Sequence, residues 1–365
     1  MISVRYGKAV EIISQKETTM EVMVEIDNER YKAINYNRLT GFVEIGDTLL
    51  LNTTAVDLNL GTGGYHFVIS NITKAERTFP PGGHIMKLRY TPFQLKVFAA
   101  EEQESKYHDI FNKFQSLDSM PVIVGTLHSM LPAIVEVLKF FHGDLKIAYV
   151  MTDAAALPLD FSNLVYQLKR DQKIAGTITI GHAFGGDIEC INIYNGLIAA
   201  KEIINAHVAV VTMGPGIVGT GTKFGFTGIE QGNIIDAVND LGGIPIAVPR
   251  ISFADRRQRH YGISHHTLTV LDTICKTAAL VGIPIFDEGK HAFILHQLEG
   301  TGIKKKHRLI FQACNDIEDI LENSPIQLKT MGRNFEQEKE FFMAAGLSGK
   351  IAIDMLNDHQ SSIAE

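Results

Sequence analysis

The sequence predicts an α/β protein with a doubly wound, mainly parallel, Rossmann-like sheet, preceded by an all-β barrel-like domain. Residues 120–290 alternate continuous apolar runs with amphipathic helical patterns, which indicates a parallel sheet covered by helices on both faces. The first 75 residues instead contain short Val-, Ile- and Tyr-rich segments separated by turn signals, as in a small barrel. A chain of 365 residues is also longer than one ordinary core requires.

Residues 1–75 are predicted to form the barrel-like domain. Its five expected strands are 4–13, 20–26, 30–36, 48–53 and 65–70, and turn signals separate them: Asp27-Asn28, "EIGD" at 44–47 and "GTGG" at 61–64. Residues 76–119 are expected to be a connecting segment of strands and a short helix. Within it, "TFPPGGH" at 78–84 breaks regular structure.

Residues 120–290 are predicted to be the Rossmann-like domain. The expected strands are 121–126, 146–152, 175–182, 207–213, 244–250 and 283–288, and the expected helices between them are 130–141, 161–172, 195–206, 228–242 and 266–282. Residues 291–365 are expected to be mixed C-terminal elements that pack on this domain. They comprise two strand-like pieces, then helices near 314–323 and 334–357.

Composition excludes several classes of partner. The formal net charge of −7 gives no global attraction to nucleic acid or to an anionic membrane. The three cysteines, Cys190, Cys275 and Cys314, are far apart, which fits a reducing compartment and neither a disulfide framework nor a zinc site. The N-terminus lacks the apolar core of a signal peptide, and no window holds 18 uncharged apolar residues. We therefore expect a cytoplasmic protein with no membrane partner.

Polar residues follow each predicted strand. Thr152 and Asp153 follow the second strand, His182 and Asp187 the third, and Arg250 the fifth. Because ligands of open parallel sheets bind outside the carboxyl ends of the strands, these positions predict a ligand site on one rim.

The glycine-rich stretch "MGPGIVGTGTKFG", 213–225, follows the fourth strand and contains a literal G-x-G-x-x-G. A dinucleotide fingerprint needs a helix that begins within the motif and an acidic residue farther on, but no helix can begin before about Thr227 and Arg250 ends the next strand. An NAD(P)-dependent oxidoreductase is therefore a weaker alternative. The favoured interpretation is anion binding by backbone amides and hydroxyls, and the competing one is a wide turn across the sheet. The anion-binding candidates are Gly214, Gly216, Gly219, Thr220, Gly221 and Thr222.

Arginines gather after the fifth predicted strand. "DRRQRH" at 255–260 contains three of them, and Arg250 precedes it. Guanidinium groups match the forked oxygens of phosphate and carboxylate, so Arg250 and Arg257 are further candidates for holding a small anion. The alternative is a solvated loop of paired charges.

Histidines and aspartates supply candidate acid–base groups. The bend in "HAFGGD" lets His182 and Asp187 face one cavity, and Ser264 in "SHHT" is expected to cap a helix whose first turn holds His265 and His266. The candidate catalytic residues are Asp153, His182, Asp187, His265 and His266. A divalent metal is a candidate cofactor, with His182, Asp187 and His265 as candidate ligands. The alternatives are that Asp187 caps the next helix and that both helix-end histidines lie on the surface.

Five stretches carry a family resemblance: "MTDAAALPL", "GHAFGGD", "MGPGIVGTGTKFGFTGIEQG", "PRISFADRRQRH" and "SHHTLTVL". Together they resemble an uncharacterised bacterial family known only as a domain of unknown function. The resemblance extends from the barrel through the α/β part, and it implies no activity, cofactor or catalytic residue.

These observations favour an enzyme that acts on a small anionic substrate, phosphorylated or nucleotide-like, with a hydrolase-type reaction preferred. The alternative is a metabolite-binding regulatory or interaction protein without catalysis. The expected partner is a small anionic molecule and not nucleic acid. A homodimer is also compatible with the sequence, because the apolar face of "GLIAAKEIINA" suits a core or an interface equally.

Overall fold

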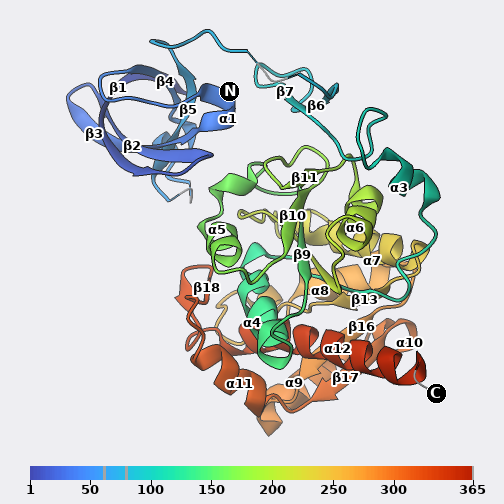
Figure 1. Ribbon diagram of the computed structural model, residues 1–365. Helices are drawn as coiled ribbons and strands as arrows, with labels where there is room; N and C mark the ends of the chain where they lie inside the picture. Colours follow the sequence, from blue (N-terminus) through green and yellow to red (C-terminus); the bar gives the residue numbers. More distant parts are fainter. Residues whose placement is uncertain (61–62, 79–80, 364–365) are drawn as a thin grey trace. The chain divides into compact units, whose positions relative to one another are not determined.

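The chain forms two compact units, Met1–Lys96 and Val97–Glu365 (Figure 1). The structure is a computed structural model, and it describes residues 1–60, 63–78 and 81–363. The first half of the "GTGG" turn signal (61–62) and residues Phe79 and Pro80 of "TFPPGGH" therefore lie outside the described residues.

The first unit contains a closed five-stranded barrel, as the sequence predicts. The strands are β1 (Val4–Gln15), β2 (Thr19–Ile26), β3 (Glu29–Tyr36), β4 (Thr48–Asn52) and β5 (Tyr65–Asn71), in the order β1-β2-β3-β5-β4. β3 pairs with β5 in parallel and the other pairs are antiparallel. Asp27 and Asn28 make the two-residue β2–β3 turn with φ of 51° and 66°, the type I′ geometry that tightly joined hairpins favour.

Alternating residues of the barrel strands fill its core. Val22, Val24, Leu49 and Leu51 are buried in one cluster.

Short helices α1 (Asn37–Thr40) and α2 (Thr54–Asp57) flank β4, and a ribbon of β6 (Ile85–Lys87) and β7 (Leu95–Val97) follows the barrel. The short helix expected before residue 119 is α3 (His108–Lys113).

The second unit contains one sheet of eight parallel strands, in the order β11-β10-β9-β12-β8-β13-β16-β17. The bounds are β8 (Pro121–Val124), β9 (Ile147–Thr152), β10 (Gly176–Thr179), β11 (Ile188–Glu189), β12 (Val208–Met213), β13 (Ile244–Ala247), β16 (Leu280–Pro284) and β17 (Arg308–Gln312). Alternate strand residues enter different cores: Ile123 joins one cluster, whereas Val122 and Val124 join the other. The continuous apolar runs therefore reflect burial on both faces.

Helices cover both faces of this sheet (Figure 1). One face packs against α4 (Leu131–Phe141), α5 (Asn163–Arg170), α11 (Asn315–Glu322) and α12 (Lys339–Ile363). The other packs against α6 (Ile193–Glu202), α7 (Glu230–Asp240), α8 (His265–Thr269), α9 (Glu288–Glu299) and α10 (Ile303–Lys306). This is the doubly wound α/β architecture that the sequence predicts.

The strand order places a topological switch at the centre of the sheet. From β8 the chain crosses one face through α4 to β9, and from β12 it crosses the opposite face through α7 to β13. The loops that follow β8 and β12 therefore diverge at the carboxyl edge. Such a divergence opens a crevice in which α/β proteins bind ligands.

The sixth long strand differs from its predicted position. β16 begins at Leu280, whereas the sequence suggests a helix through residue 282. The helical turns end at Ile274 and Cys275 is extended, and the Asp236 carboxylate then accepts hydrogen bonds from the amides of Lys276 and Thr277. A side chain of α7 thus ends the helix, which local periodicity cannot reveal.

The sheet also continues past residue 290. β17 is its edge strand, and the first residues of the C-terminal segment, 291–299, lie in helix α9. The C-terminal helices expected near 314–323 and 334–357 are α11 and α12. The C-terminal segment is therefore part of the α/β unit itself.

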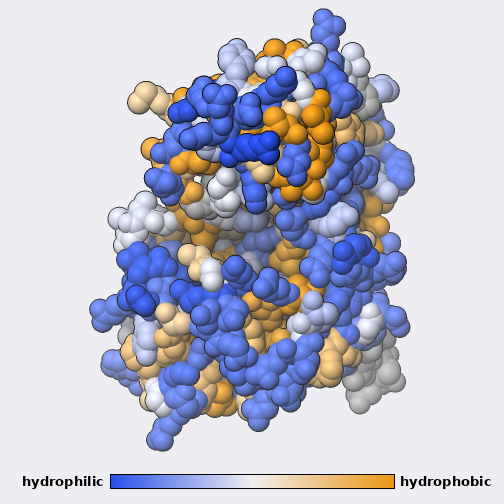
Figure 2. Space-filling view, turned by 90° about the vertical axis from the view of Figure 1, so that its left-hand side faces the viewer, coloured by the Kyte–Doolittle hydropathy of each residue, from blue (hydrophilic) through white to orange (hydrophobic). Residues whose placement is uncertain are grey.

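Apolar residues are concentrated between the sheet and its helices. The visible face in Figure 2 carries mostly polar side chains around smaller apolar groups. None of the helices within the described ranges combines the length and the apolar character needed to cross a membrane.

Candidate functional site

The loops at the carboxyl edge of the sheet contact one another. After β9 and β10, the backbone amide of His182 donates to the Asp153 carboxylate at 2.8 Å. After β9 and β12, the amide of Ala156 donates to the carbonyl of Pro215 at 3.0 Å. These loops thus form a continuous rim above the sheet.

The glycine-rich stretch folds into a tight hairpin. The amide of Thr220 donates to the Gly225 carbonyl at 2.8 Å, and the hydroxyls of Thr220 and Thr222 lie 2.9 Å apart. The Gly225 amide donates to the Thr222 hydroxyl at 3.1 Å. Both hydroxyls therefore stabilise the hairpin. The next α-helix starts at Glu230 after a 3₁₀ turn, so the glycines do not open a helix as a dinucleotide fingerprint would.

Each candidate glycine has a distinct role. A Cβ on Gly214 would lie 2.4 Å from the Ala156 carbonyl oxygen, so only glycine allows that close approach. Gly216 and Gly221 have φ of +105° and +80°, which favours glycine. Gly219 and Gly221 line a small pocket, whereas Gly214 and Gly216 precede its lining residues in the same loop.

The pocket has a cavity volume of about 60 Å³. It combines the glycine hairpin with arginines and histidines that follow β13. The lining residues are Ile217, Val218, Gly219, Gly221, Arg250, Arg257, Arg259, His260, His266 and Met331. We call this the Arg–His pocket. Its volume is that of roughly two water molecules, which suits one compact charged group of a larger ligand.

The arginine side chains that line the Arg–His pocket carry more positive charge than the neighbouring Asp255 carboxylate neutralises. Arg250 is only 4% exposed, and its Nη2 lies 3.3 Å from Asp255 Oδ2. Arg257 Nη2 lies 2.7 Å from the same oxygen, and hydrogen bonds from Arg257 hold the pKa of Asp255 well below its usual range. Arg259 has no ion pair within the described ranges. Three guanidinium groups thus border the pocket, and Asp255 pairs with two of them. Glu338 and Arg333, which pair with each other, act on Arg250 with opposite charges.

The backbone after β13 is fixed against the start of α8. The amide of Arg250 donates to the Thr267 hydroxyl at 3.0 Å, and the amide of Ser264 donates to the Arg250 carbonyl at 2.9 Å. The hairpin of β14 (Ile251–Ser252) and β15 (Gly262–Ile263) spans the intervening residues. This support brings the arginine loop and the histidines of α8 together.

Three histidines cluster at this junction: His260, His265 and His266. One ring nitrogen of each lies within 4.8 Å of the others. The Ser264 hydroxyl lies 2.8 Å from His260 Nδ1 and caps α8 by accepting from the His266 amide at 3.3 Å. His266 stacks on Phe226 with ring centroids 3.9 Å apart, so it is a packed residue.

The histidine rings are held neutral. Burial, followed by the charges of Arg250 and Arg257, lowers the pKa of His260 to about 3. Burial and the neighbouring histidines lower the pKa of His266 to about 3, and burial with the charge of Arg259 lowers that of His265. Within the described part of the chain, His265 Nε2 and His266 Nδ1 are buried without a hydrogen-bond partner, which is a costly state for a polar atom.

A second acidic group lies elsewhere on the rim. The Thr152 hydroxyl donates to Glu230 Oε1 at 2.6 Å. Burial, together with the negative charge of Asp153, raises the pKa of Glu230 to about 7 against the opposing Thr152 hydrogen bond. Asp153 and His182 belong to this neighbourhood, and neither lines the Arg–His pocket.

Asp187 serves the turn between β10 and β11. Its carboxylate accepts from the amide and hydroxyl of Thr177 at 2.9 and 2.8 Å and pairs with Lys169. Thr177 is the second residue of β10, so these bonds draw Asp187 toward the amino end of that strand. Asn192 caps the following helix instead. The structure thus does not bring Asp187 to His265 as joint metal ligands, and His265 groups with the other two histidines of its cluster.

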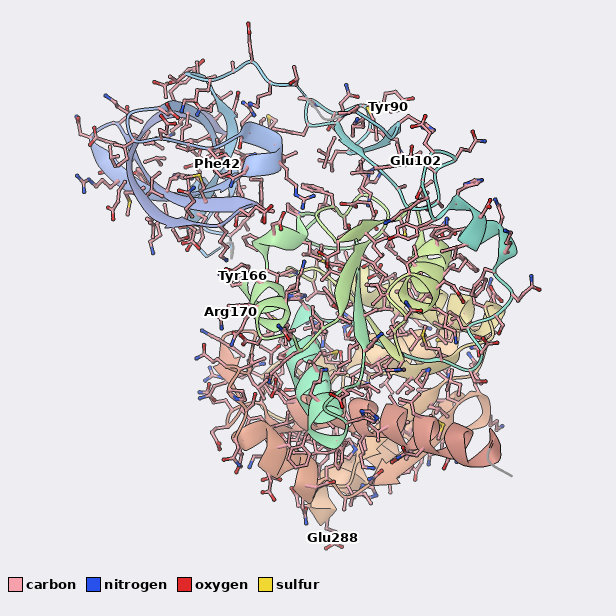
Figure 3. The ribbon with its side chains drawn as sticks, in the orientation of Figure 1. Phe42, Tyr90, Glu102, Tyr166, Arg170 and Glu288 are labelled. Carbon is pink, nitrogen blue, oxygen red and sulfur yellow. The ribbon has the colours of Figure 1, made fainter. Side chains whose placement is uncertain are left out.

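A partly buried serine–histidine pair lies near β9. His128 Nε2 lies 2.7 Å from Ser162 Oγ, which also caps α5 by accepting from Val165. Burial lowers the pKa of His128 to about 4. This pair stabilises the packing of α5, whose exposed side is marked by Tyr166 and Arg170 in Figure 3.

The acidic residues after β16 face solvent. Asp287 caps α9 by accepting from the Lys290 amide, and Glu288 points away from the unit (Figure 3). They take no part in the Arg–His pocket.

Sequence reasoning missed several residues of the site. His260 is the last residue of "DRRQRH" and was not proposed as a site residue. Its closeness in sequence to His265 and His266 is the feature that could have indicated a histidine cluster. Glu230 stood at a helix start with no local sign of its raised pKa. Met331 comes from the turn between β18 (Lys329–Thr330) and β19 (Arg333–Asn334), and no local pattern could place it here.

The Arg–His pocket lies among the loops that follow β12 and β13, at the carboxyl edge of the parallel sheet. The chain belongs to the family described as protein of unknown function (DUF3866), whose sequence profile matches residues 32–349. A comparison with curated proteins finds no match.

Proposed function

We propose that the protein is an enzyme that acts on a small anionic substrate, with the Arg–His pocket holding the anionic group. The observation that carries the proposal is the excess of arginine: three guanidinium groups border the pocket, and Asp255 is the carboxylate that pairs with two of them. Guanidinium groups bind phosphate and carboxylate oxygens in fork geometry.

The small cavity suits a phosphoryl or carboxylate group, and the rest of the substrate would extend over the rim. We take phosphate esters as the first substrate class to test, because arginine pairs and backbone amides are a recurring phosphate-binding combination. A hydrolase-type reaction is favoured.

The neighbouring histidines favour catalysis over binding alone. A neutral imidazole offers a ring nitrogen to a substrate or to a metal ion, and His265 Nε2 and His266 Nδ1 have no hydrogen-bond partner among the described residues. On the same rim, a Glu230 with a pKa of about 7 is poised to exchange a proton near neutral pH.

Arg259 offers the sharpest test. It lines the pocket, is exposed, and has no carboxylate partner within the described ranges, so Arg259→Met removes charge without orphaning an acid. We expect the affinity for inorganic phosphate, measured by calorimetry, to fall about ten- to hundredfold. Arg256→Met is the matched control, because Arg256 is exposed and does not line the pocket. Equal phosphate affinity in both variants would contradict the proposal.

Catalysis is tested separately with a turnover screen on phosphate esters and nucleotides. The second candidate function, a metabolite-binding regulator, is favoured by the barrel, which is a compact unit with its own core. Thermal stabilisation by a metabolite without turnover would support that alternative.

A further inference from the structure

We infer that His260, His265 and His266 bind a divalent transition-metal ion of the zinc class, whose remaining coordination position takes the anion held in the Arg–His pocket. One ring nitrogen of each lies within 4.8 Å of the others. The inference rests on the proposed function for the identity of the anion, but the metal site itself does not.

The cluster needs little rearrangement to ligate. Imidazole nitrogens on a tetrahedral zinc ion at about 2.1 Å are separated by about 3.4 Å. The nitrogens already lie within 4.8 Å of one another, so each pair has to approach by at most about 1.4 Å to complete the site. Imidazole ligands suit Zn²⁺, Co²⁺, Ni²⁺ and Cu²⁺.

The free ring nitrogens point to a missing ligand. His265 Nε2 and His266 Nδ1 are buried and have no hydrogen-bond partner among the residues that the structure describes, and His266 is only 5% exposed. His260 Nδ1 lies 2.8 Å from the Ser264 hydroxyl, which leaves Nε2 for a metal. A metal ion held by one ring nitrogen of each histidine would give this buried polar cluster a partner.

Neighbouring groups fix the ligand rings. Phe226 stacks on the His266 ring at an interplanar angle of 7°, and a Cβ on Gly219 would lie 3.3 Å from Cε1 of the same ring. The Ser264 hydroxyl orients His260 as a second-shell partner orients a metal-bound histidine. The glycine hairpin and the serine cap thus support the proposed ligands.

Charge determines what completes the site. Three neutral imidazoles bring no negative charge, and Arg250, Arg257 and Arg259 border the same pocket. These guanidinium groups repel a bare cation, so an anion that touches both metal and arginines offsets the repulsion. The metal and the anion must therefore raise each other's affinity by the same factor.

Cobalt(II) titration of the full-length, EDTA-treated protein tests the inference, because protein-bound Co²⁺ of low coordination number absorbs strongly in the visible range. The wild type is expected to bind one equivalent, and His265→Gln to weaken binding at least tenfold. His296→Gln, an exposed histidine on α9, is the matched control and is expected to bind as the wild type does. Circular dichroism verifies that each variant is folded.

Inorganic phosphate supplies the second arm. It is expected to raise the Co²⁺ affinity, and Co²⁺ to raise the phosphate affinity equally. Absence of visible Co²⁺ absorption in the wild type, with or without phosphate, would overturn the metal site, and so would equal Co²⁺ affinity in folded His265→Gln. If phosphate binds the metal-free protein while Co²⁺ does not bind, the metal inference fails and the proposed function stands. If phosphate does not change the Co²⁺ affinity, the inference that the metal ion and the arginines hold the same anion is wrong.

Discussion

Replacing Glu230 with glutamine tests whether the rim holds a carboxyl group with a raised pKa. Burial raises the pKa of Glu230 from 4.5 to about 7. Because the folded-state value lies above the unfolded-state value, the folded chain binds the proton more tightly. The stabilising contribution of that proton is present at low pH and is lost as the pH rises from 4.5 through 7.

The size of the effect follows from the shift. A difference of about 2.5 pKa units corresponds to about 3 kcal/mol of stability lost by pH 8. Glutamine is neutral at every pH and can still accept the Thr152 hydrogen bond. At pH 8 the free energy of unfolding of Glu230→Gln should therefore exceed that of the wild type by about 2–3 kcal/mol, and its urea midpoint should be higher. At pH 4.5 the two proteins should unfold at nearly the same urea concentration.

The assay is urea unfolding of both proteins across this pH range, with Glu288→Gln as the control. Glu288 is exposed, and its substitution should change stability by less than about 0.5 kcal/mol at any pH. If the stability difference between the wild type and Glu230→Gln does not change with pH, the pKa of Glu230 is not raised in the folded protein. If Glu230 takes part in catalysis, the stabilised variant should also lose activity.

Two further predictions concern the frame of the Arg–His pocket. Asp255→Ala should destabilise the α/β unit by about 3–5 kcal/mol in urea unfolding, because it leaves the buried Arg250 guanidinium unpaired; a change below about 1 kcal/mol would contradict this. Gly214→Ala should weaken phosphate binding in calorimetry, because its Cβ would lie 2.4 Å from the Ala156 carbonyl oxygen and displace the glycine loop. Gly143→Ala is the control, since a Cβ there meets nothing within 4 Å; indistinguishable phosphate affinities in the two variants would show that the loop position is unimportant.

Much of the fold follows from local sequence periodicity. The five barrel strands and the strands β8, β9 and β12 carry their signal in apolar runs and turn residues, because burial on one or two faces fixes which positions must be apolar. The start of β16 was misplaced because Asp236, distant in sequence, ends the preceding helix. Such a long-range hydrogen bond leaves no periodic trace.

The site was predictable in outline only. The rule for carboxyl ends of parallel strands placed Arg250 and the glycine hairpin on one rim. It could not distinguish residues that enter the pocket from those, such as Asp187, whose side chains turn back toward the sheet. It also could not place Met331, which reaches the pocket from a distant C-terminal turn.

Anion binding in the Arg–His pocket can be observed directly in a crystal structure of the protein soaked with tungstate, a heavy-atom mimic of phosphate. We expect one strong tungsten peak in the Arg–His pocket, within hydrogen-bond reach of the Arg257 and Arg259 guanidinium groups. Tungstate bound only at other surfaces, with the pocket holding water alone, would contradict it.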